Sequence, residues 1–300
     1  MNLDSPISFE ASLKSLDTEN WLDRKFYRPV GFRIAMLLRH TPITPNIVTI
    51  FSIFVGVGAG LLFYPQNTLI NLIGIVLLIF ANVLDCVDGQ LARITGIKSK
   101  VGRILDGLCG EIWFLTFYIV LSLRLMNETH LGAWAFLIAL LSAFSHFTQA
   151  SVLDYYKTLH LHILKGGHNS EFETSKEILA KARSFSWKAD PSYKLFLLMY
   201  YVYTLNQEKR TPQLQRYLAR LRTKYPNGIP ENEIAMFRAE SLKMMPLLDA
   251  FTFNARSMIL FISLLLNIEW LYFFCEIVVL NPLLLFAIRR HEKMLVRLDQ

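Results

Sequence analysis

The chain has 300 residues, of which 53% are hydrophobic and only 18% are charged, and its mean hydropathy is +0.34. This composition excludes an ordinary soluble protein and indicates an integral membrane protein with several crossings. The net charge of +7 then points to orientation in the membrane and attraction to anionic lipid headgroups, and it gives little support to nucleic-acid binding. The three cysteines lie in apolar segments without metal-ligand spacing.

The N-terminal region, residues 1–44, is polar or amphipathic. Over 20–40, aromatic and aliphatic residues alternate with arginines, which predicts a helix on the inner membrane surface; a soluble amphipathic helix is the alternative. We expect no cleavable secretory signal, because this region has no uninterrupted apolar run. Thr44 and Pro45 mark the start of the next helix, with Thr44 as its cap and Pro45 in its first turn.

Six apolar runs are long enough to cross a bilayer. They cover residues 46–64, 68–87, 104–123, 131–153, 246–265 and 268–288. The sequence therefore predicts an all-α integral membrane protein, a six-transmembrane-helix bundle with an N-terminal surface amphipathic helix and a cytoplasmic helical insertion. The expected divisions are 1–44, the N-terminal region; 45–157, spans one to four; 158–243, the insertion; 244–290, spans five and six; and 291–300, a cytoplasmic tail.

Basic residues set the expected topology. They gather in the N-terminal region, at the C-terminus and in the loop between spans two and three, where they are Arg93, Lys98, Lys100 and Arg103. The alternate loops hold Arg124 and almost nothing else. By the positive-inside rule, both termini and the second loop face the cytoplasm. We expect a multi-pass protein of the bacterial inner membrane or its equivalent.

The predicted insertion, residues 158–243, is charged and polar and is interrupted by glycines and prolines. Within it, apolar residues recur at helical spacing between 195 and 205 and again between 214 and 221. We expect a small helical subdomain on or near the membrane face.

Three aspartates stand at the ends of two apolar runs. Asp85 and Asp88 are three residues apart and so share one helix face, while Asp106 begins the next span near the same membrane face. A carboxylate at bilayer depth costs roughly 2.5–3.5 kcal/mol, so three of them need a compensating partner. No cysteine or histidine joins them, which favours Mg²⁺ or Mn²⁺ over zinc.

Small residues and one arginine accompany these carboxylates. Gly89 permits close approach of a helix or a phosphate group, Ala92 keeps the face uncluttered, and Arg93 suits a phosphate. On the next span three glycines are expected to allow tight helix packing. They are Gly102, Gly107 and Gly110.

The pattern Asp85-x2-Asp88-Gly89-x2-Ala92-Arg93-x8-Gly102-x3-Asp106 resembles the signature of the CDP-alcohol phosphotransferases, or CDP-alcohol phosphatidyltransferases, six-span enzymes that build phospholipid headgroups. The resemblance extends to Pro45-Asn46-x2-Thr49 and leaves the segment 158–243 outside it. It implies attack of an acceptor hydroxyl on the β-phosphate of a CDP-linked donor, with release of CMP, at a site that holds two Mg²⁺ or Mn²⁺ ions.

The resemblance also implies roles for individual residues. Asp85, Asp88 and Asp106 would be the metal ligands, and a homodimer is expected. The residues placed against the CDP moiety are Asp88, Gly89, Ala92, Arg93 and Gly102, with Asn46 and Thr49 as further polar contacts. For Asn46 and Thr49, capping and packing at a helix start are an equally good interpretation.

The chain departs from the family pattern at the fourth aspartate, which is the general base in the family. Gly110 stands at that position and Glu111 follows it. We hypothesise that Glu111 is the base, together with Asp106 in catalysis, and that a π-bulge between them restores a common facing. The alternative is that Glu111 only pairs with a basic residue.

Polar residues on the other spans are candidates for the acceptor pocket. They are Arg256, His146, Gln149 and Asp154. Arg256 would bind an anion, unless Glu276 pairs with it, and His146 would otherwise make an interhelical hydrogen bond. A cationic pocket favours inositol phosphate or glycerol phosphate as acceptor and CDP-diacylglycerol as donor.

Three other functions stay open. A CDP-amino alcohol could deliver its headgroup to a lipid hydroxyl. The carboxylates could line a divalent-cation transporter, since intramembrane acidic groups also build ion pathways. The missing fourth aspartate could mark a non-catalytic scaffold.

Overall fold

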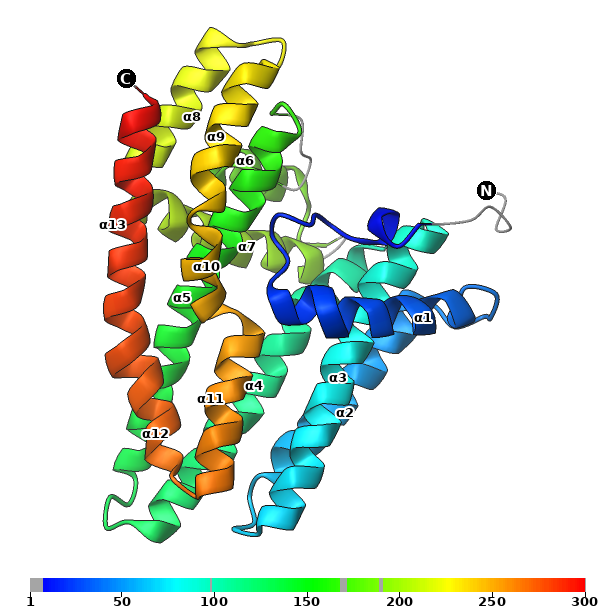
Figure 1. The fold of residues 1–300 in the computed structure, drawn as a ribbon, viewed down its shortest axis with the longest axis vertical. Coiled ribbons are helices and arrows are strands. Elements are labelled where there is room, and N and C mark those ends of the chain that lie inside the picture. The colour runs from blue at the N-terminus through cyan, green and yellow to red at the C-terminus, as the bar shows by residue number, and fades with distance from the viewer. Residues whose placement is uncertain (1–7, 98, 168–171, 189–190, 300) are drawn as a thin grey trace. The chain divides into compact units, whose positions relative to one another are not determined.

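The computed structural model describes residues 8–97, 99–167, 172–188 and 191–299, without the side chains of Lys100, Val101 and Arg103 (Figure 1). Lys98 and the side chains of Lys100 and Arg103, which entered the topology prediction, thus lie outside the described residues. All regular elements within the described ranges are helical, so the predicted all-α fold is confirmed.

The helices follow one another with short connections. They are η1 (Glu10–Ser12), η2 (Asp23–Tyr27), α1 (Arg28–Leu38), α2 (Pro45–Leu62), α3 (Thr68–Thr95), α4 (Lys100–Glu128), α5 (Trp134–Leu164), α6 (Ser175–Ser184), α7 (Pro191–Arg210), α8 (Pro212–Lys224), α9 (Glu231–Leu242), α10 (Met245–Leu248), η3 (Asp249–Phe251), α11 (Phe253–Leu266), α12 (Glu269–Phe274), η4 (Cys275–Val279) and α13 (Leu280–Leu298). Here η1 and η3 are 3₁₀-helices, and η2 and η4 are π-helical turns.

Among the described residues, five stretches are long and apolar enough to cross a membrane. They are Pro45–Leu62, Thr68–Thr95, Ile104–Glu128, Trp134–Leu164 and Glu269–Leu298. A sixth crossing exists if Met245–Phe251 and Phe253–Leu266, which are separated by a break at Thr252, count as one bent span. The protein is therefore an integral membrane protein, and its described residues contain five or six crossings, in agreement with the predicted plan.

The chain divides into two compact units. The first consists of Met1–His146 and Phe253–Val279, and the second of Phe147–Thr252 and Leu280–Gln300.

In the first unit, glycines let the spanning helices approach closely. A Cβ on Gly56 of α2 would lie 2.2 Å from the Trp113 ring of α4, and one on Gly74 of α3 would lie 2.7 Å from the ring of Phe63. Trp113 and Phe63 are almost fully buried. The core of this unit is therefore built from large rings set against helix backbone, which is how apolar spans associate where no water is displaced.

Local signals fix the ends of α2 and α3. Pro45 opens α2 and Thr44 stands at its N-cap position, both as predicted, although the Thr44 side chain makes no capping hydrogen bond. Asn67 caps α3 by accepting from two backbone N–H groups, and α3 ends at Gly96, which has a φ of 72°.

The buried Arg124, near the C-terminal end of α4, connects this helix to the end of α2 and to the α11–α12 turn. Arg124 is 2% exposed, forms an ion pair with Glu269, and donates to the Phe63 carbonyl at 2.8 Å and to the Asn267 amide oxygen at 3.2 Å. The single basic residue that sequence reasoning assigned to this side is thus neutralised inside the unit, and it adds no exposed positive charge there.

The chain is helical without a break over residues 21–38, in agreement with the predicted range 20–40, and this helix consists of the π-helical turn η2 and the α-helix α1 that follows it. It lies across the end of α3 (Figure 1). A Cβ on Gly31 would be 2.6 Å from the Gln90 side-chain oxygen and 3.1 Å from the Cys86 Cβ, so only glycine permits this approach. Trp21 and Leu37 are 72% and 75% exposed, respectively.

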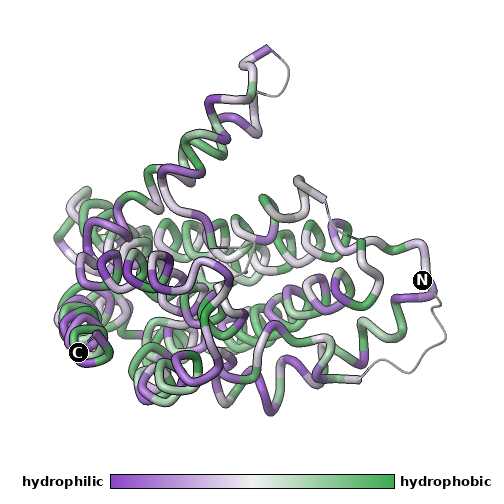
Figure 2. The backbone as a smooth tube through the Cα atoms, turned by 90° about the horizontal axis from the view of Figure 1, so that it is seen from above, coloured by the Kyte–Doolittle hydropathy of each residue, from purple (hydrophilic) through white to green (hydrophobic). Residues whose placement is uncertain are grey.

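The second unit contains the helices of the predicted insertion together with the end of α5 and with α13. Its core includes Tyr156 of α5, Tyr217 of α8, Phe237 of α9 and Leu284 of α13. The Glu292 carboxylate on α13 accepts from the first backbone N–H groups of α8, Gln213 at 2.7 Å and Leu214 at 3.3 Å. Figure 2 shows hydrophilic and hydrophobic residues together in the helix that leads to the C-terminus, which is seen end-on there.

Candidate active site

The three aspartates come together as the sequence predicts. Asp85 and Asp88 lie on one face of α3, and Asp106 lies in the second turn of α4. One carboxylate oxygen from each lies within 4.8 Å of the other two. Asp88 is buried, Asp85 is partly buried and Asp106 is exposed. Three hard oxygen donors at this spacing can bind one divalent cation together.

The first turns of α2 fix both helices that carry these carboxylates. The Thr49 hydroxyl donates to the Asp88 carboxylate at 2.5 Å. The Asn46 amide donates to the Ser99 hydroxyl at 3.0 Å, and Ser99 in turn accepts from the Gly102 N–H at 2.8 Å at the start of α4. Asn46 and Thr49 therefore have packing and capping contacts in this structure, which is the alternative that the sequence left open for them.

Ser99 is a site residue that sequence reasoning missed. It is the N-cap of α4, and its position just before the helical run is a recognisable signal for that role. A Cβ on Gly102 would lie 2.4 Å from the Asn46 side-chain oxygen and 2.9 Å from the Ser99 hydroxyl. The motif glycine at this position therefore makes room for the Asn46–Ser99 contact.

The other two glycines of α4 behave differently from the prediction. Among the residues that the structure describes, no heavy atom lies within 4 Å of a Cβ built on Gly107 or on Gly110. The expectation of tight helix packing is thus confirmed for Gly102 and wrong for Gly107 and Gly110. Their surface on α4 is open instead.

The predicted π-bulge between Asp106 and Glu111 is wrong, because α4 is α-helical from Lys100 to Glu128. With about 100° per residue, Glu111 points about 140° around the helix from Asp106, whereas Gly110 points only about 40° away. Glu111 is exposed. The two carboxylates therefore do not share a face.

Arg256 is held by an acidic partner. Its guanidinium on α11 donates to the Glu276 carboxylate on η4, and both side chains are 1% exposed. The pairing that sequence analysis offered as the alternative for these two residues is therefore present.

The remaining pocket candidates are divided between the units. His146, in the first unit, contacts the Tyr118 hydroxyl through Nδ1 at 3.0 Å and meets the Phe114 ring edge-on at 4.1 Å between centroids. Gln149, in the second unit, donates to the Asn281 side chain at 2.9 Å, and Asp154 of the same unit is exposed.

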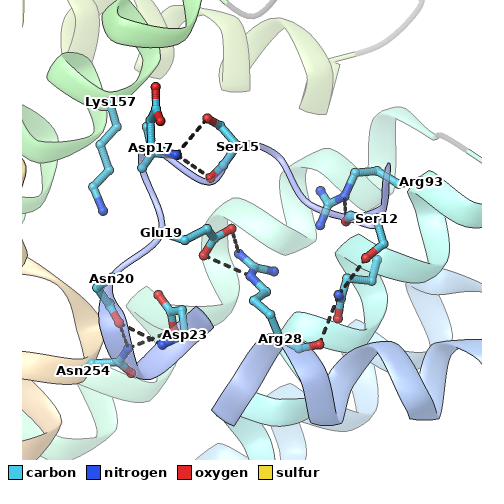
Figure 3. A network of polar contacts seen from close by, with 12 residues as sticks. Ser12, Ser15, Asp17, Glu19, Asn20, Asp23, Arg28, Arg93, Lys157 and Asn254 are labelled. Atoms are coloured by element: carbon cyan, nitrogen blue, oxygen red, sulfur yellow. Dashed lines mark hydrogen bonds and ion pairs between the residues drawn. The ribbon is translucent and has the colours of Figure 1, made fainter. Parts of the chain in front are cut away.

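N-terminal residues that sequence reasoning did not associate with the motif contact it directly (Figure 3). The Ser12 carbonyl accepts from Arg93 Nε at 2.5 Å, and the Ser12 hydroxyl accepts from Gln90 at 3.0 Å. Neither contact has a sequence signature, because the partners are 81 and 78 residues apart and one acceptor is a backbone group.

A family comparison agrees with this site. The sequence model described as CDP-alcohol phosphatidyltransferase matches residues 42–210, more than half of the chain, and covers α2 to α7. The chain belongs to this family. The match runs on to residue 210, so the expectation that the whole segment 158–243 lies outside the family pattern is wrong for its first part.

Curated relatives within the family match shorter stretches. Archaetidylinositol phosphate synthase of Pyrococcus horikoshii is 45% identical over 74 residues, which are 25% of this chain and 38% of that protein. Phosphatidylinositol phosphate synthase of Mycobacterium tuberculosis is 27% identical over 109 residues, 33% of this chain and 49% of that protein. The Corynebacterium glutamicum enzyme of the same name is 35% identical over 79 residues, 26% and 35% respectively. The chain thus spans less than half the length of each of these relatives.

Proposed function

We propose that this protein transfers the phosphatidyl group of CDP-diacylglycerol to a phosphorylated polar alcohol, with inositol phosphate as first choice and glycerol phosphate as second, and releases CMP. The observation that carries the proposal is the convergence of Asp85, Asp88 and Asp106 within 4.8 Å in a member of the CDP-alcohol phosphatidyltransferase family. The names of the relatives support inositol phosphate as the acceptor.

The donor set fits a hard divalent cation. It consists of carboxylate oxygens, and no histidine or cysteine belongs to the cluster among the described residues. We therefore propose that Asp85, Asp88 and Asp106 hold Mg²⁺ or Mn²⁺ in a two-metal site. When bound, these ions would neutralise the diphosphate and the charge that develops on the departing CMP.

The chain's own residues would orient the reacting groups. In the transfer, the acceptor oxygen forms a bond to the β-phosphorus, the bond from that phosphorus to the CMP oxygen breaks, and the hydroxyl proton leaves. Arg93 would bind the donor diphosphate through paired N–H groups. Gly89, Ala92 and Gly102 would leave room for the CDP moiety. Thr49, by donating to Asp88, fixes the direction of that carboxylate.

Glu111 remains our candidate for the base that accepts the proton at its carboxylate oxygen. Around α4 the order is Asp106, Gly110, Gly107 and Glu111, at about 0°, 40°, 100° and 140°. Both intervening glycines have open space above them. The proposal therefore requires the Glu111 side chain to reach back over this bare strip to the attacking hydroxyl at the aspartate cluster, without any π-bulge.

The base proposal is tested by Glu111→Gln. Loss of a general base lowers turnover by about 100-fold or more, whereas CDP binding should stay unchanged because the nucleotide is held by other residues. Near-normal turnover would show that another group takes the proton. Gly110→Asp is the companion variant, since it places a carboxylate on the Asp106 face where the structure has room for it.

We also propose that the aspartate cluster and both termini face the cytoplasm. Exposed arginines and lysines of the N-terminal region and of α13 support this orientation. Arg124 does not oppose it, because its charge is paired with Glu269 inside the unit. The cytoplasmic placement of residues 158–243 stays a prediction, which protease accessibility in sealed vesicles would test. The homodimer also stays a prediction, which light scattering in detergent would test.

The deciding experiment is a CMP-release screen in detergent or liposomes with Mg²⁺ or Mn²⁺. CDP-diacylglycerol is combined in turn with inositol phosphate, inositol, glycerol phosphate and serine, and Asp88→Asn serves as the inactive control. Release with inositol phosphate alone supports the proposal. Consumption of CDP-ethanolamine by a lipid hydroxyl, or cation uptake by vesicles without CMP release, would replace it with another function.

A further inference from the structure

The N-terminal strap, defined here as residues 8–28, lies outside the part of the chain that the family model matches and covers the motif end of α3 (Figure 3). Its contact with Arg93 is specific. Arg93 donates through Nε to the Ser12 carbonyl at 2.5 Å. A guanidinium binds phosphate in pairs of N–H groups, either through Nε and one terminal nitrogen or through the two terminal nitrogens. With Nε engaged by the strap, the second mode remains.

The terminal nitrogens of Arg93 lie over the motif glycine. A Cβ on Gly89 would be 3.2 Å from Nη2 and 3.6 Å from Nη1. Gly89 directly follows Asp88 of the metal-binding cluster. The Nε edge of the guanidinium therefore contacts the strap, and its Nη1 and Nη2 edge lies above Gly89, which has no side chain.

The Ser12 carbonyl is itself held in place. Ser12 is fully buried, and its hydroxyl donates to the Phe9 carbonyl at 2.6 Å and accepts from Gln90 Nε2 at 3.0 Å. Gln90 is also fully buried and donates to the Arg28 carbonyl at 3.2 Å. The Phe9 ring meets Phe32 of α1 edge-on at 5.5 Å between centroids. Gln90 on α3 thus donates hydrogen bonds to the strap both near its start, at Ser12, and at its end, at Arg28.

The distal part of the strap has its own anchors within the same unit. Glu19 pairs with Arg28 at 3.0 Å. The Asn254 amide on α11 donates to Asn20 at 3.1 Å and to Asp23 at 2.8 Å. Two independent attachments, to α3 and to α11, fix this segment over the cluster side of the unit, so Ser12 is a rigid acceptor.

We propose that the strap is part of the donor site, with Ser12 as a positioning residue whose backbone carbonyl holds Arg93 so that Nη1 and Nη2 face the diphosphate of the donor. Gln90 contributes indirectly, because its hydrogen bond to the Ser12 hydroxyl fixes the position of Ser12. The proposal rests on the proposed function, since it takes the diphosphate of a CDP-linked donor as the ligand of Arg93.

The test is deletion of residues 1–13 in the otherwise complete chain, with two readouts. One is equilibrium binding of CDP in detergent with Mg²⁺, and the other is the KM for CDP-diacylglycerol and for the acceptor. Loss of one hydrogen bond to a charged group should weaken CDP binding and raise the donor KM by about tenfold, while the acceptor KM stays the same. In a protein that already carries Arg93→Lys, the deletion should change the CDP affinity and the donor KM by less than about twofold, because both changes remove the same contact.

Ser12→Ala is the second variant and covers the case in which the deleted protein does not fold. It removes the Phe9 and Gln90 contacts of the hydroxyl and should weaken CDP binding by about threefold. Ser15→Ala, the same change on the strap away from Arg93, should have no effect. Thermal unfolding of each variant shows whether it is folded.

The outcomes separate the two proposals. If the wild-type protein binds CDP but releases no CMP with any acceptor, the proposed transfer is wrong, and the strap is judged on CDP affinity alone. Equal CDP affinity in wild type, Ser12→Ala and the deleted protein would overturn the strap proposal. The strap proposal would also be overturned if the deletion raised the donor KM and the acceptor KM equally. It would be overturned as well if the deletion weakened CDP binding as strongly in the Arg93→Lys protein as in the wild type. Absence of CDP binding by the wild type would overturn both.

Discussion

The ion pair between Arg256 and Glu276 gives a quantitative prediction. Both side chains are 1% exposed and lie on apolar helices of the first unit. Glu276→Gln leaves the guanidinium charged, buried and without its carboxylate. Breaking one side of such a pair costs about 3–5 kcal/mol, which corresponds to a shift in the folding equilibrium of roughly 150- to 4,000-fold.

Removal of both charges should be much less harmful. The double variant Arg256→Met/Glu276→Leu fills a similar volume with apolar atoms and removes two desolvated charges, so its stability should equal or exceed that of the wild type. The assay is thermal unfolding in detergent, followed by labelling of the buried Cys86 and Cys109 with a thiol-reactive fluorophore. Glu231→Gln, at an exposed position on α9, is the control for loss of an acidic group.

The same double variant decides whether Arg256 also binds the acceptor. If it does, the folded double variant should show a rise in acceptor KM of about tenfold or more with an unchanged donor KM, since a charged hydrogen bond is lost. If the pair is purely structural, both constants should stay near wild type. The reasoning on stability would be refuted by a Glu276→Gln protein that unfolds at the wild-type temperature, or by a double variant less stable than the single one.

Further predictions concern the cluster and the helix contacts. Thr49→Val removes the donor to Asp88 and should lower CMP release by roughly 10- to 150-fold, from about 1.5–3 kcal/mol for a hydrogen bond to a charged group; Thr49→Ser keeps the hydroxyl and should retain most activity. Chelation of divalent cations should abolish CMP release, and Mg²⁺ or Mn²⁺ but not Zn²⁺ should restore it; activity that persists in chelator would contradict the metal assignment. Gly56→Ala, with its Cβ 2.2 Å from Trp113, should cost about 1–3 kcal/mol by overpacking. Gly58→Ala on the same helix has no atom within 4 Å and should be neutral or stabilising by up to about 1 kcal/mol, so equal melting temperatures for the two variants would disprove the packing argument.

Features that depend on the chain's own periodicity could be predicted from the sequence. Spanning helices follow from the length of apolar runs, and the meeting of Asp85 with Asp88 follows from a three-residue separation on a helix. The placement of Asp106 beside them also followed from its position at the opposite end of a short loop. The first two inferences need no knowledge of which helices pack together, and the third needs only that two helices joined by a short loop start and end on the same side of the membrane.

Features that depend on tertiary partners were missed or mistaken. The five-residue spacing of Asp106 and Glu111 allows a π-bulge but does not force one, and α4 stays regular. Gly107 and Gly110 have the composition of a packing face, yet no helix approaches them closely. Ser12 could not be found at all, because what it offers to Arg93 is a carbonyl group that every residue has.

The buried Arg124 has a consequence for the order in which the membrane protein is assembled. Its partner Asn267 comes 143 residues later in the chain, and Glu269 follows two residues after that. In the proposed topology the nascent chain must carry this arginine across the bilayer long before either partner has been synthesised. The first four spans therefore enter the membrane with Arg124 in contact with the Phe63 carbonyl and with Glu128 but without its buried carboxylate partner, and the last spans supply that partner as Glu269. A ribosome stalled before Asn267 should leave an intermediate that stays bound to the insertion machinery instead of moving into the lipid.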